Sequence, residues 1–240
     1  MLRHALLLAA ALGAYFWYLR GGPFPPHILA GRRFARLAAR SGTLFGAGAA
    51  LGLAAAGRTG ALFAPPPEFA GAAAIARRWL PGMTEPTAFG LIALGLVIGG
   101  TVGALLSRWR GRVFALGNVT AVLPRHRGEL GWAALLALSS GVSEELFFRL
   151  FLPLAVAAAA GSGVVGFAVA TLLFGLAHRY QGWSGMVATS GAGLLLAAIY
   201  LASGSIWVAA ALHAILNLNG LVLRPLAMGV GAIRDPIAPF

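Results

Sequence analysis

Cysteine is absent from this 240-residue chain, which excludes disulfides, thiolate metal sites, iron–sulfur clusters, a cysteine nucleophile and a lipidated cysteine. Lysine is absent as well, so arginine supplies all 18 basic residues. Acidic residues number only six. Charged residues make up 10% of the chain, against about 25% in a soluble domain. The chain therefore has too little charge to cover the surface of a soluble protein of this size.

Hydrophobic residues make up 59% of the chain, so a lipid bilayer is its natural surroundings. Glycine and alanine recur inside the apolar runs, where small residues let transmembrane helices approach closely. The net charge of +12 comes from arginines that lie mostly between these runs, as the positive-inside rule describes, and this pattern argues against a nucleic-acid partner. Wealth in alanine, glycine and arginine without lysine is typical of a high-GC bacterial genome, so we expect a bacterial inner membrane protein.

The apolar runs predict an all-α, polytopic transmembrane bundle in one integral membrane domain over residues 1–240. The first run is retained rather than cleaved as a signal peptide, because aromatic residues stand at 15–18, where a small-residue cleavage site would lie. One short span could be re-entrant, so six to eight spans are compatible with the pattern. The seven expected spans cover residues 5–19, 43–63, 87–106, 130–160, 164–178, 183–201 and 206–223.

Arginines in the connections predict the orientation of this bundle. The stretch 20–40 holds three prolines and five arginines without an acid, so we expect it to be a cytoplasmic loop. The stretch from the "APPPEF" segment to Pro86 carries both signs of charge and is expected outside. Arginines between 108 and 127 mark a second cytoplasmic loop, and Arg224 and Arg234 follow the last span. The C-terminus is therefore predicted to be cytoplasmic.

Ionisable residues inside apolar helices are rare, because each costs at least ~2.5–3.5 kcal/mol to insert. The segment "SGVSEELFFRLF" nevertheless carries Glu144, Glu145 and Arg149. Glu145 and Arg149 stand four residues apart and share a helix face, so they are expected to pair, with the acid N-terminal to the base. Glu144 points about 100° away around the helix and needs a different partner.

Two further polar clusters follow, each with the same four-residue spacing. "FGLAH" places Phe174 and His178 on one helix face, and "HAILN" does the same for His213 and Asn217. Each cluster has a structural interpretation on its own: an ion pair, an interfacial histidine, or hydrogen bonds between helices.

Taken together, these groups can satisfy one another in a bilayer only by converging, and convergence creates a polar pocket that admits water. Such a pocket suits Glu144 to act as a general base, and a histidine with an asparagine supplies donors for an oxyanion. Serine chemistry fits less well, because the serines before Glu144 have no G-x-S-x-G context.

The three motifs "EELFFR", "FGLAH" and "HAILN", in this order on apolar helices, resemble those of the CPBP family of CaaX proteases and bacteriocin-processing (Abi) proteins. The resemblance covers the helices at 130–223 and implies a glutamate-type intramembrane endopeptidase. Glu144 would activate water, His178 would help to position it, and His213 and Asn217 would stabilise the oxyanion. Glu145, Arg149 and Phe174 would support the site.

The resemblance implies no cofactor in the preferred interpretation, whereas the alternative is a zinc metalloprotease with Glu144 and the two histidines as ligands. The expected partner is a membrane-embedded or membrane-associated peptide or protein substrate, processed during maturation or at its C-terminus, as in CaaX-like or myxosortase-like enzymes. Two alternatives without protease activity stay open: a proton-coupled transporter and a bacteriocin self-immunity protein. The substrate and the oligomeric state are not indicated by the sequence.

Overall fold

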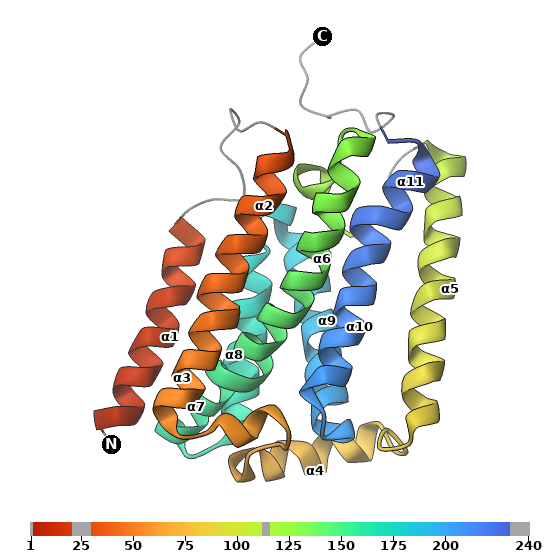
Figure 1. Cartoon of the computed structure of the whole chain (residues 1–240). Helices are drawn as coiled ribbons and strands as arrows, with labels where there is room; N and C mark the ends of the chain where they lie inside the picture. Colours follow the sequence, from red (N-terminus) through yellow and green to blue (C-terminus); the bar gives the residue numbers. More distant parts are fainter. Residues whose placement is uncertain (1, 21–29, 112–115, 231–240) are drawn as a thin grey trace.

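The computed structural model describes residues 2–20, 30–111 and 116–230 of the chain, and these residues form helices without any strand (Figure 1). The predicted all-α class is therefore confirmed. Most helices run along a common axis. They are α1 (Leu2–Arg20), α2 and α3 (Ala30–Ser41 and Gly48–Ala56), α5 (Pro86–Arg110), α6 and α7 (Leu130–Glu145 and Leu152–Ala160), α8 (Gly163–Ala177), α9 (Gly182–Ser203), and α10 and α11 (Ile206–Leu218 and Arg224–Met228).

Three π-helical segments join pairs of these helices into longer rods. Gly42–Ala47 links α2 to α3, Leu146–Phe151 links α6 to α7, and Asn219–Leu223 links α10 to α11. Two of these segments follow residues of the polar motifs: Glu144 and Glu145 precede the second segment, and Asn217 precedes the third. Single π-turns inside α-helices are frequent at functional sites.

Among the described residues, three helices are long and apolar enough to cross a membrane: Pro86–Arg110, Arg179–Ser203 and Ile206–Met228. Ala5–Arg20 and Gly163–Ala177 are shorter apolar helices. The rod from Leu130 to Ala160 is also long, but it carries three charged residues at its centre. The chain thus has the character of an integral membrane protein, while the number of seven spans stays a prediction.

The prediction of a loop at 20–40 is wrong from residue 30 onward, because Ala30–Ser41 forms the helix α2, whereas the predicted cytoplasmic side of this segment stays a prediction. Phe34 and Ala38 are buried against Ala133 and Leu136 of α6, whereas Arg36 is exposed. Arg33 is buried on the same helix and pairs with Glu129. The helix is amphipathic, since helical spacing brings its apolar residues to one face, but its arginines make the segment polar on average. Residues 21–29, with the prolines of the predicted loop, lie outside the described residues, as do Arg112 and Arg234.

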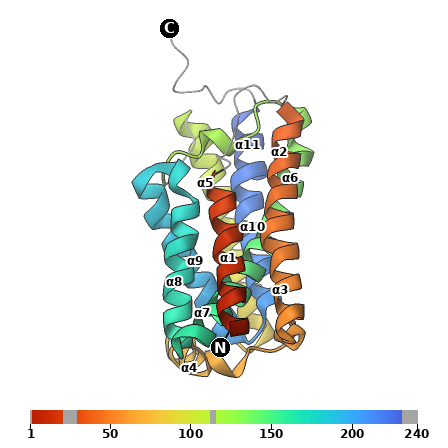
Figure 2. The same cartoon turned by 90° about the vertical axis from the view of Figure 1, so that its left-hand side faces the viewer.

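The predicted second span, 43–63, and the connection after it also differ from the structure. The helix ends at Ala56, because Gly57 takes the left-handed conformation at φ 67°. Within the expected connection, α4 (Ala70–Trp79) lies across one end of the bundle (Figures 1 and 2). Its small residues Ala72, Ala73 and Ala76 are buried, so it packs closely on the ends of the long helices. We call this end of the molecule the α4 end.

The rods α6–α7 and α10–α11 cross at very short range, and this crossing places the polar motifs. A Cβ on Gly141 would lie 2.8 Å from the backbone N and Cα of Ala214, so any residue larger than glycine would force the helices apart. The crossing lies between Ser140 and Glu144 on one rod and beside His213 on the other. It therefore sets the distance across which the polar side chains of the two rods meet.

Candidate active site

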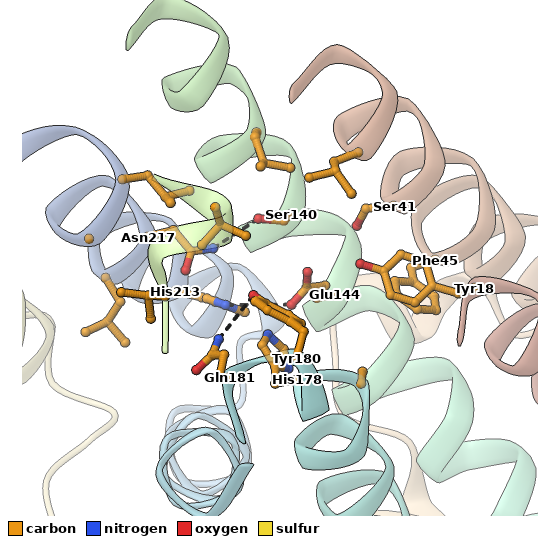
Figure 3. A pocket seen from close by; sticks show the side chains of 18 of the residues that line it. Tyr18, Ser41, Phe45, Ser140, Glu144, His178, Tyr180, Gln181, His213 and Asn217 are labelled. Carbon is orange, nitrogen blue, oxygen red and sulfur yellow. Dashed lines mark hydrogen bonds and ion pairs between the residues drawn. The ribbon is translucent and has the colours of Figure 1, made fainter. Parts of the chain in front are cut away.

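A cavity of about 620 Å³ occupies the half of the bundle away from α4. Glu144 of α6, His178 at the end of α8, and His213 and Asn217 of α10 all line it (Figure 3). Much of the remaining wall is apolar or aromatic and comes from α1, α2, the segment before α6, and α10. The volume falls in the range of small-ligand and peptide pockets. The three motifs are thus brought together in one partly open cavity.

Glu144 faces the cavity while remaining largely buried, with 8% of its surface exposed. Its Oε2 lies 3.9 Å from Nε2 of His213, which is too long for a direct hydrogen bond. No hydrogen bond of the Glu144 carboxylate occurs among the described residues. A carboxylate held in this way has lone pairs available for a water molecule in the cavity.

Glu145 turns to the other side of α6 and lies fully buried behind the cavity wall. Its Oε1 lies 2.9 Å from Nη1 of Arg149, so the two side chains form the ion pair that their spacing predicts. The guanidinium of Arg149 stacks over the ring of Phe174 at 4.0 Å from the ring centre. Arg149 is thus held in a buried position by one opposite charge and one aromatic face.

His213 connects this buried pair to the cavity. Its Nδ1 lies 2.7 Å from Oε1 of Glu145. Because an ionised carboxylate accepts and cannot donate, Nδ1 carries the proton of this bond, and Nε2 faces Glu144. Glu145 therefore fixes both the orientation and the tautomer of the imidazole. The sequence predicts the Glu145–Arg149 pair but gives no signal for this third partner, which stands 68 residues away.

His178 lies just past the last turn of α8, and Nδ1 donates to the backbone oxygen of Phe174 at 2.9 Å. The ring of Phe174 packs on His178 with 4.8 Å between centroids and on His213 with 5.9 Å. Phe174 thus contacts both imidazoles and Arg149, which explains its place in the motif. The second nitrogen of His178, Nε2, remains available toward the cavity.

Asn217 lies one turn after His213 on α10 and donates from Nδ2 to Oγ of Ser140 at 3.0 Å. Ser140 lies four residues before Glu144, on the same face of α6. This hydrogen bond fixes the amide so that its second N–H remains for another acceptor. From the sequence, Ser140 is only a weak candidate nucleophile, whereas in the structure its hydroxyl accepts a hydrogen bond from Asn217.

Further polar residues of the cavity lie outside the motifs: Tyr18, Ser41, Arg179, Tyr180, Gln181 and Arg224. Tyr180 and Gln181 follow His178 directly in the chain and line the cavity, and Gln181 donates to the Tyr180 hydroxyl at 3.1 Å. Ser41 of α2 also lines it and shares a 2.7 Å hydrogen bond with Ser143. Proximity to His178 is the one signal that points to Tyr180 and Gln181, and nothing in the local sequence marks Ser41.

The formal charges around the cavity are unequal. Glu144 and Glu145 stand beside the guanidinium of Arg149, and two further guanidinium groups, those of Arg179 and Arg224, line the cavity. Uncompensated charge is costly at low dielectric constant. With these two arginines counted, the guanidinium groups around the cavity outnumber the carboxylates by three to two.

A metal site would need several of these side chains around one point. Among the described residues, no group of three or more His, Asp or Glu side chains is placed to hold one metal ion. The Nδ1 atoms of both histidines contact Phe174 and Glu145, which leaves Nε2 of each ring toward the cavity. In the described part of the chain, Glu144, His178 and His213 are thus not gathered into a three-ligand set, and we derive no step through a metal.

Comparison with known proteins gives one match. No curated protein and no solved structure matches the chain significantly. The family of type II CAAX prenyl endopeptidases, Rce1-like, matches residues 126–219, a range that contains all three motifs and leaves residues 1–125 outside. Residues 126–219 are thus similar to the Rce1-like family, and this match confirms, for that range, the resemblance of the three motifs to the CPBP family.

Proposed function

We propose that the protein is an intramembrane endopeptidase that hydrolyses a peptide bond with water activated by Glu144. The observation that carries the proposal is the convergence of Glu144, His178, His213 and Asn217 on one cavity in the half of the bundle away from α4. The Rce1-like match supports the same reaction class, since the family is one of endopeptidases.

In the first step, a water molecule is held between the Glu144 carboxylate and Nε2 of His178. Glu144 takes one proton as the water oxygen attacks the carbonyl carbon of the substrate, and a tetrahedral oxyanion forms. His178 can accept the second hydrogen of the water, because its Nδ1 proton is donated to Phe174. In the second step, the C–N bond breaks and the proton on Glu144 passes to the leaving nitrogen.

The oxyanion is stabilised by the free Nδ2–H of Asn217 and by His213. Nδ1 of His213 is committed to Glu145, so His213 donates through Nε2 when the ring carries both protons. Glu145, 2.7 Å from Nδ1, supplies the counter-charge for that imidazolium. Glu145 and Arg149 do not reach the cavity and act by holding His213 in place.

The substrate is a membrane-associated or membrane-embedded peptide segment that enters the cavity in an extended form. The largely apolar cavity wall supports apolar side chains next to the cleaved bond. Processing near a C-terminus, of the CaaX or sorting-signal type, fits this class. The cavity then opens toward the cytoplasm, because the arginines of α2 and of the segment before α6 lie at its end of the bundle. The α4 end carries fewer arginines, among them Arg58 before α4 and Arg77 and Arg78 within it.

Purified protein in detergent tests this proposal with three quenched peptides. Two end in Cys-aliphatic-aliphatic-Ser, one with the cysteine farnesylated and one without, and the third has an apolar helix followed by a basic tail. We expect cleavage of at least one peptide by the wild type, located by mass spectrometry, and no cleavage by Glu144→Gln. Failure of the wild type on all three, or equal cleavage by the variant, would refute the proposal.

The metal-free reaction is tested separately with the same peptides. We expect cleavage to survive prolonged treatment with phenanthroline followed by dialysis, and the protein to hold far less than one zinc per chain. Asn217→Ala should raise the barrier by ~2.7–4 kcal/mol, a loss of about 10²–10³ in kcat, if the amide stabilises the oxyanion. Loss of cleavage on chelation, with recovery on adding zinc, would establish the metalloprotease instead.

A further inference from the structure

Tyr180 belongs to a short turn, Arg179–Gln181, between α8 and α9, two residues after the second motif. Its side chain lines the cavity together with Glu144, His213 and Asn217. Figure 3 shows the ring of Tyr180 reaching into the cavity in the direction of Glu144 and His213. Tyr180 and His178 lie at 34° to each other with ring centroids 5.9 Å apart, so the tyrosine covers the imidazole.

The hydroxyl of Tyr180 is oriented by its neighbour. Nε2 of Gln181 donates to it at 3.1 Å, so the phenol oxygen acts as acceptor in that bond and keeps its own proton. No other hydrogen bond of this hydroxyl occurs among the described residues. The Tyr180 O–H is therefore available to an acceptor that enters the cavity.

Gln181 is itself held firmly. Its backbone oxygen accepts from Asn118 N–H at 2.8 Å, and its backbone N–H donates to His178 at 2.9 Å. Its side chain packs on Gly185, where an added Cβ would lie 2.3 Å from the Cβ of Gln181. The amide that orients the Tyr180 hydroxyl is thus part of the fixed wall of the cavity.

The motif residues leave few donors to the cavity, whose wall also holds Arg179, Arg224 and the hydroxyls of Tyr18 and Ser41. His178 and His213 both use Nδ1–H outward, on Phe174 and Glu145, and as neutral rings they present lone pairs to the cavity. Glu144 is an acceptor as well. Asn217 has one N–H committed to Ser140 and one left. An oxyanion, however, is stabilised by donors, and each well-placed donor is worth about 10²–10³ in kcat.

We propose that the Tyr180 hydroxyl donates a hydrogen bond to the oxyanion, as a catalytic donor beside Asn217. This inference rests on the proposed endopeptidase function and assigns it a residue outside the three motifs. Unlike His213, Tyr180 needs no additional proton to donate. The bond strengthens as the carbonyl oxygen gains charge, so it lowers the barrier without tightening the binding of the substrate.

Tyr180→Phe tests the inference, because it removes the hydroxyl and keeps the ring over His178. With whichever quenched peptide the wild type cleaves, we expect kcat to fall by about 10-fold or more and KM to stay within about threefold. The melting temperature in detergent should stay within about 2 °C of the wild type. Gln181→Leu should lower kcat in the same direction, because the hydroxyl loses its orienting amide.

Tyr200→Phe is the matched control. Tyr200 lies 1% exposed outside the cavity, beside Phe69 and Phe167, and its hydroxyl has no hydrogen-bond partner among the described residues. Removing that hydroxyl should leave kcat within twofold.

A kcat of Tyr180→Phe within twofold of the wild type would overturn the inference. A rise in KM at unchanged kcat would overturn it as well, because it would mean that the hydroxyl binds the substrate before the reaction and not the transition state. Both results require a wild type that cleaves and a Glu144→Gln variant that does not. Failure of that comparison refutes the proposed function instead, so the two failures are distinguishable.

Discussion

Gly193 of α9 gives a sharp test of how the buried side chains hold the site. Gly193 packs against both the ring of Phe174 and the guanidinium of Arg149, which stack on each other. A Cβ added at Gly193 would stand 2.8 Å from Cδ1 of Phe174 and 2.9 Å from Nη2 of Arg149. Carbon contacts are normally about 3.5–4.0 Å, so Gly193→Ala requires a displacement of about 0.6–1 Å.

Two opposing effects decide the stability of Gly193→Ala. Overpacking of a well-packed core costs about 1–3 kcal/mol, whereas replacing glycine by alanine inside a helix contributes up to about 1 kcal/mol. We therefore expect Gly193→Ala to destabilise by about 0–3 kcal/mol. The displacement continues from Arg149 through Glu145 to His213 along bonds of 2.9 and 2.7 Å. A misplacement of about 1 Å can lower the rate by about 10²-fold, so activity should suffer more than stability.

Gly191→Ala separates the two effects. Gly191 is exposed on the same helix, and a Cβ there would meet nothing within 4 Å. It gains the helix propensity without the collision, so the difference between the two variants isolates the packing cost of about 1–3 kcal/mol. Thermal unfolding in detergent measures that difference, at about 2–4 °C for each kcal/mol, and peptide cleavage measures kcat.

Gly191→Ala should cleave like the wild type, and Gly193→Ala should lose at least about 10-fold in kcat. Equal melting temperatures and equal rates for the two variants would refute the reasoning, because they would mean that the cavity wall adapts to the extra methyl group without moving His213.

Three further predictions follow from the same geometry. Gly141→Ala should destabilise the protein by about 1–3 kcal/mol and lower kcat, because its Cβ would collide with the backbone of α10. Thermal unfolding and peptide cleavage measure these two effects, and a melting temperature equal to that of the wild type would contradict the prediction. Glu145→Gln should lower thermal stability by leaving Arg149 without its counter-charge; a double variant with Arg149→Gln that is no more stable than the single one would argue against the pair. Arg33→Met removes the guanidinium from buried Glu129, 2.9 Å away, and should cost about 3–5 kcal/mol in thermal unfolding, whereas a loss under 1 kcal/mol would show that the pair is dispensable.

The sequence predicts the residues of the motifs well, because inserting a charged side chain into an apolar helix is costly, so such residues are rare and stand out in the sequence. Four-residue spacing predicts the Glu145–Arg149 pair, and hydropathy predicts the positions of α1, α5, α8 and α9 closely. The tight turns at Gly161 and Gly204, with φ of 70° and 75°, also follow from the "GSG" and "SGS" segments.

Other features escape prediction for physical reasons. Arginines outweigh the apolar face of α2 in any hydropathy average, so a helix was expected to be a loop. The small residues of α4 carry too little hydrophobicity to mark an interfacial helix. The partner of His213 depends on the close crossing at Gly141 and Ala214, which joins residues far apart in the chain.

Tyr180 is overlooked for a similar reason. In a chain with 10% aromatic residues, a tyrosine near a helix end is expected at the membrane interface. The structure instead turns it into the cavity through a single short turn after α8. Its position depends on Gln181, Asn118 and Gly185, which no local pattern connects.

The most direct test of the central claim is the turnover rate of Glu144→Gln on a peptide that the wild type cleaves. The change keeps the size of the side chain and removes its ability to take a proton. Glu85→Gln, the same change at an exposed position before α5, is the control. We expect kcat to fall by at least about 10² for Glu144→Gln, with unchanged yield and membrane insertion, and to stay at the wild-type value for Glu85→Gln. A Glu144→Gln rate within threefold of the wild type would remove Glu144 from the chemistry and contradict the account.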